Sequence, residues 1–210
     1  MLKLTEVIHL IIAILLFAFV INFLEGNFLP ALIAAFIIIA VNVAAKKLMA
    51  FRLDSEVTHK IWHLQRWGYY ERSYFKKPIP LGIILPFLLV WISYPIGFLK
   101  VLTFIQSDIK PTPLRVTRRR GSIRQRYSAM TEWHLSLIAG MGILATAILG
   151  ILAYLFNLPL LAGFSAYYSI WNLLPISQID GCKIFFGSKI FWIFLTIISL
   201  IESLIFFIII

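Results

Sequence analysis

Residues 172–181 read NLLPISQIDG and form a short polar break between two long apolar runs. Pro175 ends the helix before it, because proline lacks the backbone donor that a continuing helix needs, and Gly181 permits a tight turn. Asp180 lies between them and is one of only nine acidic residues in the chain. By itself this aspartate is explained equally well as a loop residue that caps the last helix, so its role depends on the rest of the sequence.

The rest of the 210-residue chain has the composition of a membrane protein. Hydrophobic residues make up 61% of it and charged residues only 13%, too few to cover a soluble domain. Spanning a bilayer takes ~20 mostly apolar residues, and runs near or above that length occur at 7–23, 29–45, 81–105, 135–156, 158–176 and 190–210. The run at 29–45 continues with helical character toward Trp67. We therefore predict an all-α polytopic membrane protein with five to six transmembrane or re-entrant helices, a single domain over 1–210, in the cell membrane.

The net charge of +10 is concentrated in two stretches. Of 19 lysines and arginines, eight lie in 46–80 and seven in 106–134. Because basic loops stay in the cytoplasm, both stretches belong on one side of the membrane. The apolar segment 81–105 between them is therefore predicted to be a hairpin, with its turn at Tyr94–Gly97.

The second basic stretch is predicted to contact lipid. Arg118–Arg120 lie beside apolar segments, where a solvated loop touches anionic lipid, and no motif that reads DNA or RNA accompanies them. We therefore expect the lipid bilayer and not a nucleic acid as partner. The alternation of Leu114 and Val116 with basic neighbours predicts a short strand, half of a β-hairpin within 98–128.

A second polar stretch reads SEVTHKIWH at residues 55–63. On a helix, Glu56, His59 and His63 are spaced i, i+3 and i+7 and share one face. Such groups are costly in a bilayer unless they pair, bind an ion or reach water. The simpler explanation is a helix end at the membrane surface, with Glu56 paired to Lys60 at i+4. On spacing alone this explanation is favoured.

Together the two stretches resemble the site-2 protease family of intramembrane zinc metallopeptidases, in its compact prokaryotic form. That family has HExxH on one membrane helix and NxxP followed by DG on a later one. The resemblance covers roughly residues 30–195, and the residues that match are Glu56, His59, Asn172, Pro175, Asp180 and Gly181. It implies that two histidines and an aspartate hold zinc, and that the glutamate takes a proton from metal-bound water.

The chain departs from this pattern at the first histidine, where it has Ser55. A neutral hydroxyl is a poor zinc ligand, so zinc binding should be greatly weakened. His59 and His63 offer another i, i+4 pair, which with Asp180 would hold zinc one turn (~6 Å) along the helix. The resemblance thus implies a catalytically impaired homologue that binds membrane helices or partner proteins. The alternative is an active zinc metalloprotease that cleaves transmembrane substrates with Glu56 as general base.

Overall fold

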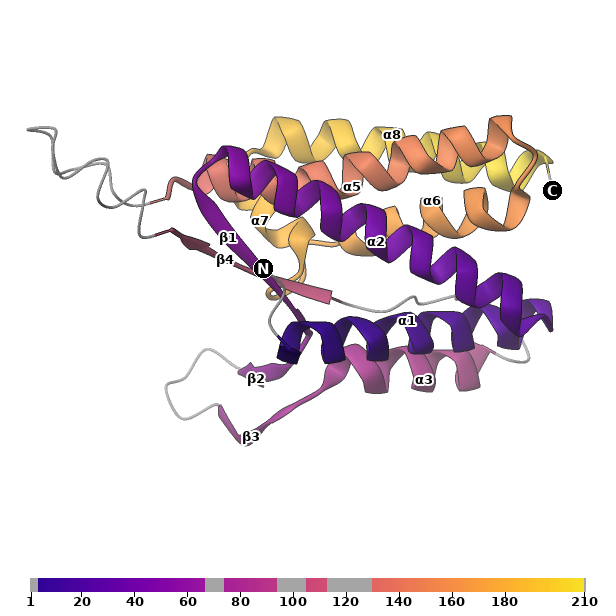
Figure 1. Cartoon of the computed structure of the whole chain (residues 1–210), viewed down its shortest axis with the longest axis horizontal. Coiled ribbons are helices and arrows are strands. Elements are labelled where there is room, and N and C mark those ends of the chain that lie inside the picture. The colour runs from indigo at the N-terminus through magenta and orange to yellow at the C-terminus, as the bar shows by residue number, and fades with distance from the viewer. Residues whose placement is uncertain (1–3, 67–73, 94–104, 113–129, 210) are drawn as a thin grey trace, which may run out of the picture.

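In the computed structural model of the chain, the described residues are 4–66, 74–93, 105–112 and 130–209. In chain order they form α1 (Leu4–Glu25), α2 (Phe28–Arg52), β1 (Ser55–Ile61), β2 (Leu64–Arg66), β3 (Tyr74–Ile79), α3 (Leu81–Ser93), β4 (Ile105–Pro111), α5 (Glu132–Leu155), α6 (Pro159–Leu173), α7 (Asp180–Gly187) and α8 (Lys189–Ile209). The long helices run side by side, and β1, β4 and α7 lie toward the end opposite the C-terminus (Figure 1).

The helices confirm the expected membrane character. Three of them, α1, α2 and α5, are long and apolar enough to cross a bilayer. Large apolar side chains such as Phe36, Ile151 and Leu200 remain about half exposed on the helix surfaces, as lipid-facing residues do. The finer prediction of five to six spanning or re-entrant helices in one domain stays a prediction.

The core forms where α1, α2 and α6 pack together. Phe17 of α1 stacks on Tyr168 of α6, with ring centroids 5.7 Å apart, and Ile38 of α2 belongs to the same buried cluster. On α5, small residues permit close packing: a Cβ at Gly140 would lie 2.2 Å from the Phe191 ring of α8. Small residues commonly bring membrane helices into such close contact.

The prediction of a helix through residues 55–63 is wrong. Helix α2 ends at Arg52, and the backbone turns at Asp54, whose φ is +49°. The following residues form β1, which pairs antiparallel with β4 along its whole length. Alternate residues of β1 are buried, and the β-branched Val57, Thr58 and Ile61 favour a pleated strand. Glu56, His59 and His63 therefore share no helix face, and His59 and His63 are no helical pair.

The strand β4 lies inside the 98–128 region where a β-hairpin was predicted, but its partner is the distant β1. A further antiparallel pair joins β2 to β3, so the fold is mostly helical with two small sheets. The predicted features Tyr94–Gly97, Leu114, Val116 and Arg118–Arg120 lie outside the described residues.

The two ends of segment 81–105 lie at one place. The backbone N–H of Gly82 donates to the Trp62 carbonyl at 2.9 Å, and Ile105 pairs with the neighbouring Ile61. After β1 the chain passes through β2 and β3, enters α3 beside Trp62 and comes back at Ile105 beside the end of β1. A hairpin over 81–105 requires this return.

Candidate functional site

Asp180 is the first residue of α7, and its side chain is fully buried. The segment before it turns sharply at Ser177, whose φ is +52°. Gly181 then packs directly on the end of α6, where a Cβ would lie 2.3 Å from the carbonyl carbon of Leu173. Because only glycine fits this close approach, residues 172–181 can fold back and place the Asp180 carboxylate inside the protein.

The carboxylate of Asp180 is paired with Lys46, a fully buried lysine of α2. The Lys46 ammonium donates to Asp180 Oδ2 and, at 3.2 Å, to the hydroxyl of Ser107 on β4. A second ammonium, that of Lys183, lies 3.7 Å from the other carboxylate oxygen, Oδ1. Three elements far apart in the sequence, α2, β4 and α7, thus meet at one buried carboxylate.

The two ammonium groups keep the Asp180 carboxylate ionised. Burial by itself would raise the pKa of the Asp180 carboxyl, but the ammonium groups of Lys46 and Lys183 outweigh burial and hold this pKa below its usual range. Removing one partner of a buried ion pair costs about 3–5 kcal/mol, because the other charge is left uncompensated. Asp180 therefore depends on Lys46 to remain buried and charged.

Asn42 lies one helical turn before Lys46 and is buried like it. Both side chains pack on Gly142 of α5, where a Cβ would lie 2.4 Å from Lys46 Cε and 3.0 Å from Asn42 Nδ2. In HExxH metalloproteases the same i, i+4 spacing presents two histidines to one metal ion. On α2 this spacing puts an amide and an ammonium on one helix face, with the ammonium against the Asp180 carboxylate.

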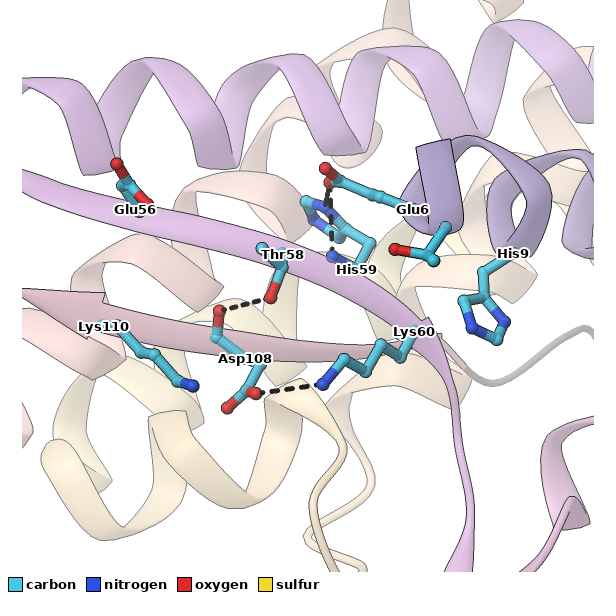
Figure 2. Close-up of a pocket in the computed structure, with 9 residues that line it drawn as sticks. Glu6, His9, Glu56, Thr58, His59, Lys60, Asp108 and Lys110 are labelled. Carbon is cyan, nitrogen blue, oxygen red and sulfur yellow. Dashed lines mark hydrogen bonds and ion pairs between the residues drawn. The ribbon is translucent and has the colours of Figure 1, made fainter. Parts of the chain in front are cut away.

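His59 points from β1 into the interior, where Glu6 of α1 holds its ring (Figure 2). Glu6 Oε1 lies 2.9 Å from His59 Nδ1, accepts the His59 backbone N–H at 3.2 Å and contacts the Lys47 ammonium at 2.8 Å. Burial lowers the pKa of His59, and although Glu6 opposes this effect, Lys46 adds to it. The neutral ring donates from Nδ1 to Glu6, and its buried Nε2 has no hydrogen-bond partner among the described residues.

Glu56, the predicted general base, lies on the face of β1 opposite His59. Residues three apart on a strand are about 10 Å apart and point to opposite sides. The Glu56 side chain is exposed and stands opposite Lys110 of β4 in the sheet register. The strand therefore directs Glu56 away from the interior in which Asp180 is buried.

The structure gives His63 and Ser55 local partners. His63 follows β1, and its Nδ1 donates to the Ile61 carbonyl at 2.5 Å. The Ser55 side chain is buried, and its hydroxyl donates to the Leu53 carbonyl at 2.9 Å. Ser55 thus stabilises the turn between α2 and β1.

The two other predicted residues shape the approach to α7. Asn172 is fully buried near the end of α6 and donates to the Tyr168 carbonyl at 2.8 Å. Pro175 is exposed in the turn that follows α6. Asn172 thus lies in the last turn of α6, and Pro175 lies in the connection that carries the chain to Asp180.

The predicted metal ligands do not fit a zinc ion in this arrangement. His59 is held by Glu6, His63 by a backbone carbonyl and Asp180 by Lys46. In the part of the chain that the structure describes, no three His, Cys, Asp or Glu side chains are grouped to hold a metal ion. Zinc takes three or four such donors, and the Lys46 ammonium puts a positive charge where a cation would meet Asp180. No zinc-dependent step follows from this geometry.

Three residues of the site, Glu6, Asn42 and Lys46, are not among those predicted from the sequence. Lys46 belongs by position to the basic stretch 46–80, so nothing in the charge pattern marks it as buried. The available signal was a lysine four residues after an asparagine on one face of an apolar helix, since polar groups inside membrane segments are commonly functional. Glu6, at the start of an apolar run, carries the same signal.

No protein-family model, no curated protein and no solved structure matches this chain. The geometry of the buried site is thus the observation on which a functional proposal rests.

Proposed function

We propose that this chain is a site-2-protease-like membrane protein that binds membrane helices or partner proteins and is catalytically impaired. The observation that carries the proposal is the buried ion pair between Lys46 and Asp180. In the family that the motifs resemble, the aspartate of the DG motif is a zinc ligand. Here an ammonium supplies the positive charge that this carboxylate needs.

A lysine can replace a metal ion as counter-charge but not as catalyst. The Lys46 ammonium has three N–H donors, with which it neutralises Asp180 and binds Ser107. It has no open coordination position at which a water molecule could be polarised and deprotonated, as zinc has. The ion pair therefore keeps α2 joined to α7 without supplying the group that peptide hydrolysis requires.

A polar hollow that extends from the exposed face of the β1–β4 sheet to Glu6 and His59, here called the outer hollow, supports a binding role. It has a volume of about 430 Å³ and is bounded on one side by the start of α1 (Figure 2). Its floor carries both signs of charge, with Lys60 3.4 Å from Asp108 and Glu56 opposite Lys110. Such a surface suits the polar segment next to a partner's membrane helix better than an apolar ligand.

The alternative, an active zinc metalloprotease with Glu56 as general base, requires a different geometry. It needs Glu56 and a metal ion on the same side of β1, because a general base must be within hydrogen-bond reach of the proton it abstracts. Glu56 lines the outer hollow together with His59, but its side chain extends from the opposite face of β1. In our proposal it is a binding residue.

One experiment tests both parts of the proposal. The protein would be reconstituted in nanodiscs with a photo-crosslinking residue at Glu56, and with a matched control at Leu155, which is exposed at the far end of α5. A labelled peptide with a membrane helix and a polar extension would be the probe. We expect crosslinking from position 56 and not from 155, an intact peptide, and no zinc above background in the unlabelled protein.

Two results would overturn the proposal. Cleavage of the peptide by the wild-type protein, abolished by a chelator or by Glu56→Gln, would establish the active protease. Equal crosslinking from positions 56 and 155, or none from either, would refute binding at the outer hollow.

A further inference from the structure

Glu202 is a buried carboxylate at the opposite end of the helices from Asp180. It lies on α8, seven residues or about 10 Å before the end of that helix, and is 9% exposed. Neither of its carboxylate oxygens has a hydrogen-bond partner among the described residues. A carboxylate in apolar surroundings is costly unless it is protonated or finds a partner, and the described helices provide no partner.

The Glu202 side chain faces a small hollow between α5, α6 and α8. The hollow has a volume of about 100 Å³, enough for the end of one side chain, and its lining is almost wholly apolar. Gly150 of α5 and Ala162 of α6 line it, and Oε2 of Glu202 lies 3.7 Å from where a Cβ on Gly150 would be. Ser165 Oγ of α6 fills the space directly beside Gly150, at 2.6 Å from the same Cβ position, and the hollow lies next to these small residues.

The rim of the hollow is open to a neighbouring helix. Ile151 and Tyr154 of α5 and Ile205 of α8 line it and are each 40–48% exposed. A flat apolar rim with small residues at its centre is the kind of surface on which membrane helices pack. The rim could therefore contact the body of a helix while a single side chain reaches Glu202.

The helices that line the hollow cannot supply a positive charge. Residues 135–182, which cover almost all of α5 and the whole of α6, contain no lysine or arginine, and α8 has one only at its first residue, Lys189, 13 positions before Glu202. A second copy of the chain, packed through the same helices, would bring no cation either. Charge complementarity thus points to a different molecule.

We propose that the hollow between α5, α6 and α8 binds the lysine or arginine side chain of a partner transmembrane helix, with Glu202 as its counter-charge. The alkyl stem of either residue matches the apolar lining, and its charged end pairs with the carboxylate. This site is separate from the outer hollow of β1, so it can fail while the proposed function stands.

The test uses designed peptides and the full-length protein in bicelles. The probe is a leucine-rich helix of about 20 residues with one lysine at the depth of Glu202, and its match has leucine there. Association would be measured by energy transfer from a donor at the protein's C-terminus. We expect the lysine peptide to bind about tenfold more tightly than the leucine peptide, as one buried polar contact in a membrane allows.

Protein variants then locate the contact. Glu202→Gln keeps the size of the side chain and removes its charge, and should bring the two peptides to within about twofold. Ile197→Gln is the matched control, because it adds an amide at a half-exposed position of the same helix and should leave the preference unchanged. Equal binding of both peptides to the wild type, or an undiminished preference in Glu202→Gln, would overturn the proposal. A glutamine-bearing peptide that binds as tightly as the lysine peptide would also overturn it, in favour of a neutral hydrogen bond.

Discussion

The ammonium of Lys46 and the carboxylate of Asp180 form an ion pair in which both side chains are fully buried. The two residues are 134 positions apart in the sequence, and their contact joins the second helix of the chain to the short helix α7. A buried pair of this kind is more sensitive to the loss of one partner than of both.

Lys46→Leu should destabilise the protein by about 3–5 kcal/mol, because it leaves Asp180 buried without its nearest cation. Asp180→Leu should have a similar effect, because it leaves the Lys46 side chain buried without its carboxylate partner. The measurement is the free energy of unfolding in a mild detergent with added denaturant. The double variant Lys46→Leu/Asp180→Leu is the control and should be less destabilised than either single variant. A double variant whose loss equals the sum of the single losses would show that the two charges are not coupled.

The position of Asn42 and Lys46 leads to a prediction about metal binding. The triple variant Asn42→His, Val43→Glu, Lys46→His introduces HExxH into α2, where position 46 lies against Asp180 and position 42 is one helical turn away on the same face. Two histidines and the aspartate would then offer three zinc donors. We expect about one zinc per chain, measured by elemental analysis after dialysis. The wild type should retain only background zinc.

The matched control for this variant adds Asp180→Asn, which removes the third donor while keeping the size of the side chain. It should lose most of the zinc that the triple variant gains. If the triple variant binds no more zinc than the wild type, the α2 pair does not converge on Asp180. The companion variant Ser55→His should gain no zinc, because Ser55 lies on a strand and bonds its own turn.

Part of this site follows from the sequence and part does not. The turn before Asp180 follows, because Pro175 and Gly181 between apolar runs indicate a helix end and a tight turn, but the burial of Asp180 does not. Lys46 does not follow, since its charge fits a solvated basic stretch as well as a buried pair. Only the three-dimensional approach of α2 to α7 distinguishes the two.

The stretch at 55–63 shows why short polar segments are ambiguous. Glu56, His59 and His63 match a helical spacing, whereas Ser55, Val57, His59 and Ile61 match the two-residue repeat of a strand. The choice depends on β4, which pairs with this stretch from about fifty positions away. Long apolar runs have no such dependence, and the helical character of α1, α2 and α5 was predicted correctly from the sequence.

Acidification should weaken the fold through His59. Its pKa is lowered from the ordinary value of 6.5 in the folded protein, chiefly by burial. Between the lowered pKa and 6.5 the unfolded chain binds more protons than the folded one, so stability falls as pH drops through this window and levels off below it. His59 contributes at most about 1.4 kcal/mol per pH unit to the change in the free energy of unfolding with pH.

The matched variant for this effect is His59→Asn, whose amide can still donate to Glu6 but does not titrate. Melting temperatures of both proteins would be measured from about pH 7.5 to about pH 5.5, the range in which histidines titrate. The wild type should lose stability relative to His59→Asn as pH falls, because all other histidines are common to both. Parallel profiles would mean that the His59 pKa is not lowered by folding. Asp180 does not affect this window, since its pKa lies below 3.8.

Two glycines of the site should respond differently to alanine, because their neighbours differ in the freedom to move. At Gly181 a Cβ would meet the backbone carbonyl of Leu173 at 2.3 Å, and backbone cannot yield without moving the end of α6. At Gly142 it would meet the flexible stem of Lys46 at 2.4 Å, and this stem can shift. We expect Gly181→Ala to cost about 3 kcal/mol and Gly142→Ala about 1 kcal/mol, as overpacking does in rigid and yielding surroundings. Unfolding free energies of the two variants, measured side by side, check this order, and the reverse order would mean that α7 does not begin directly against α6.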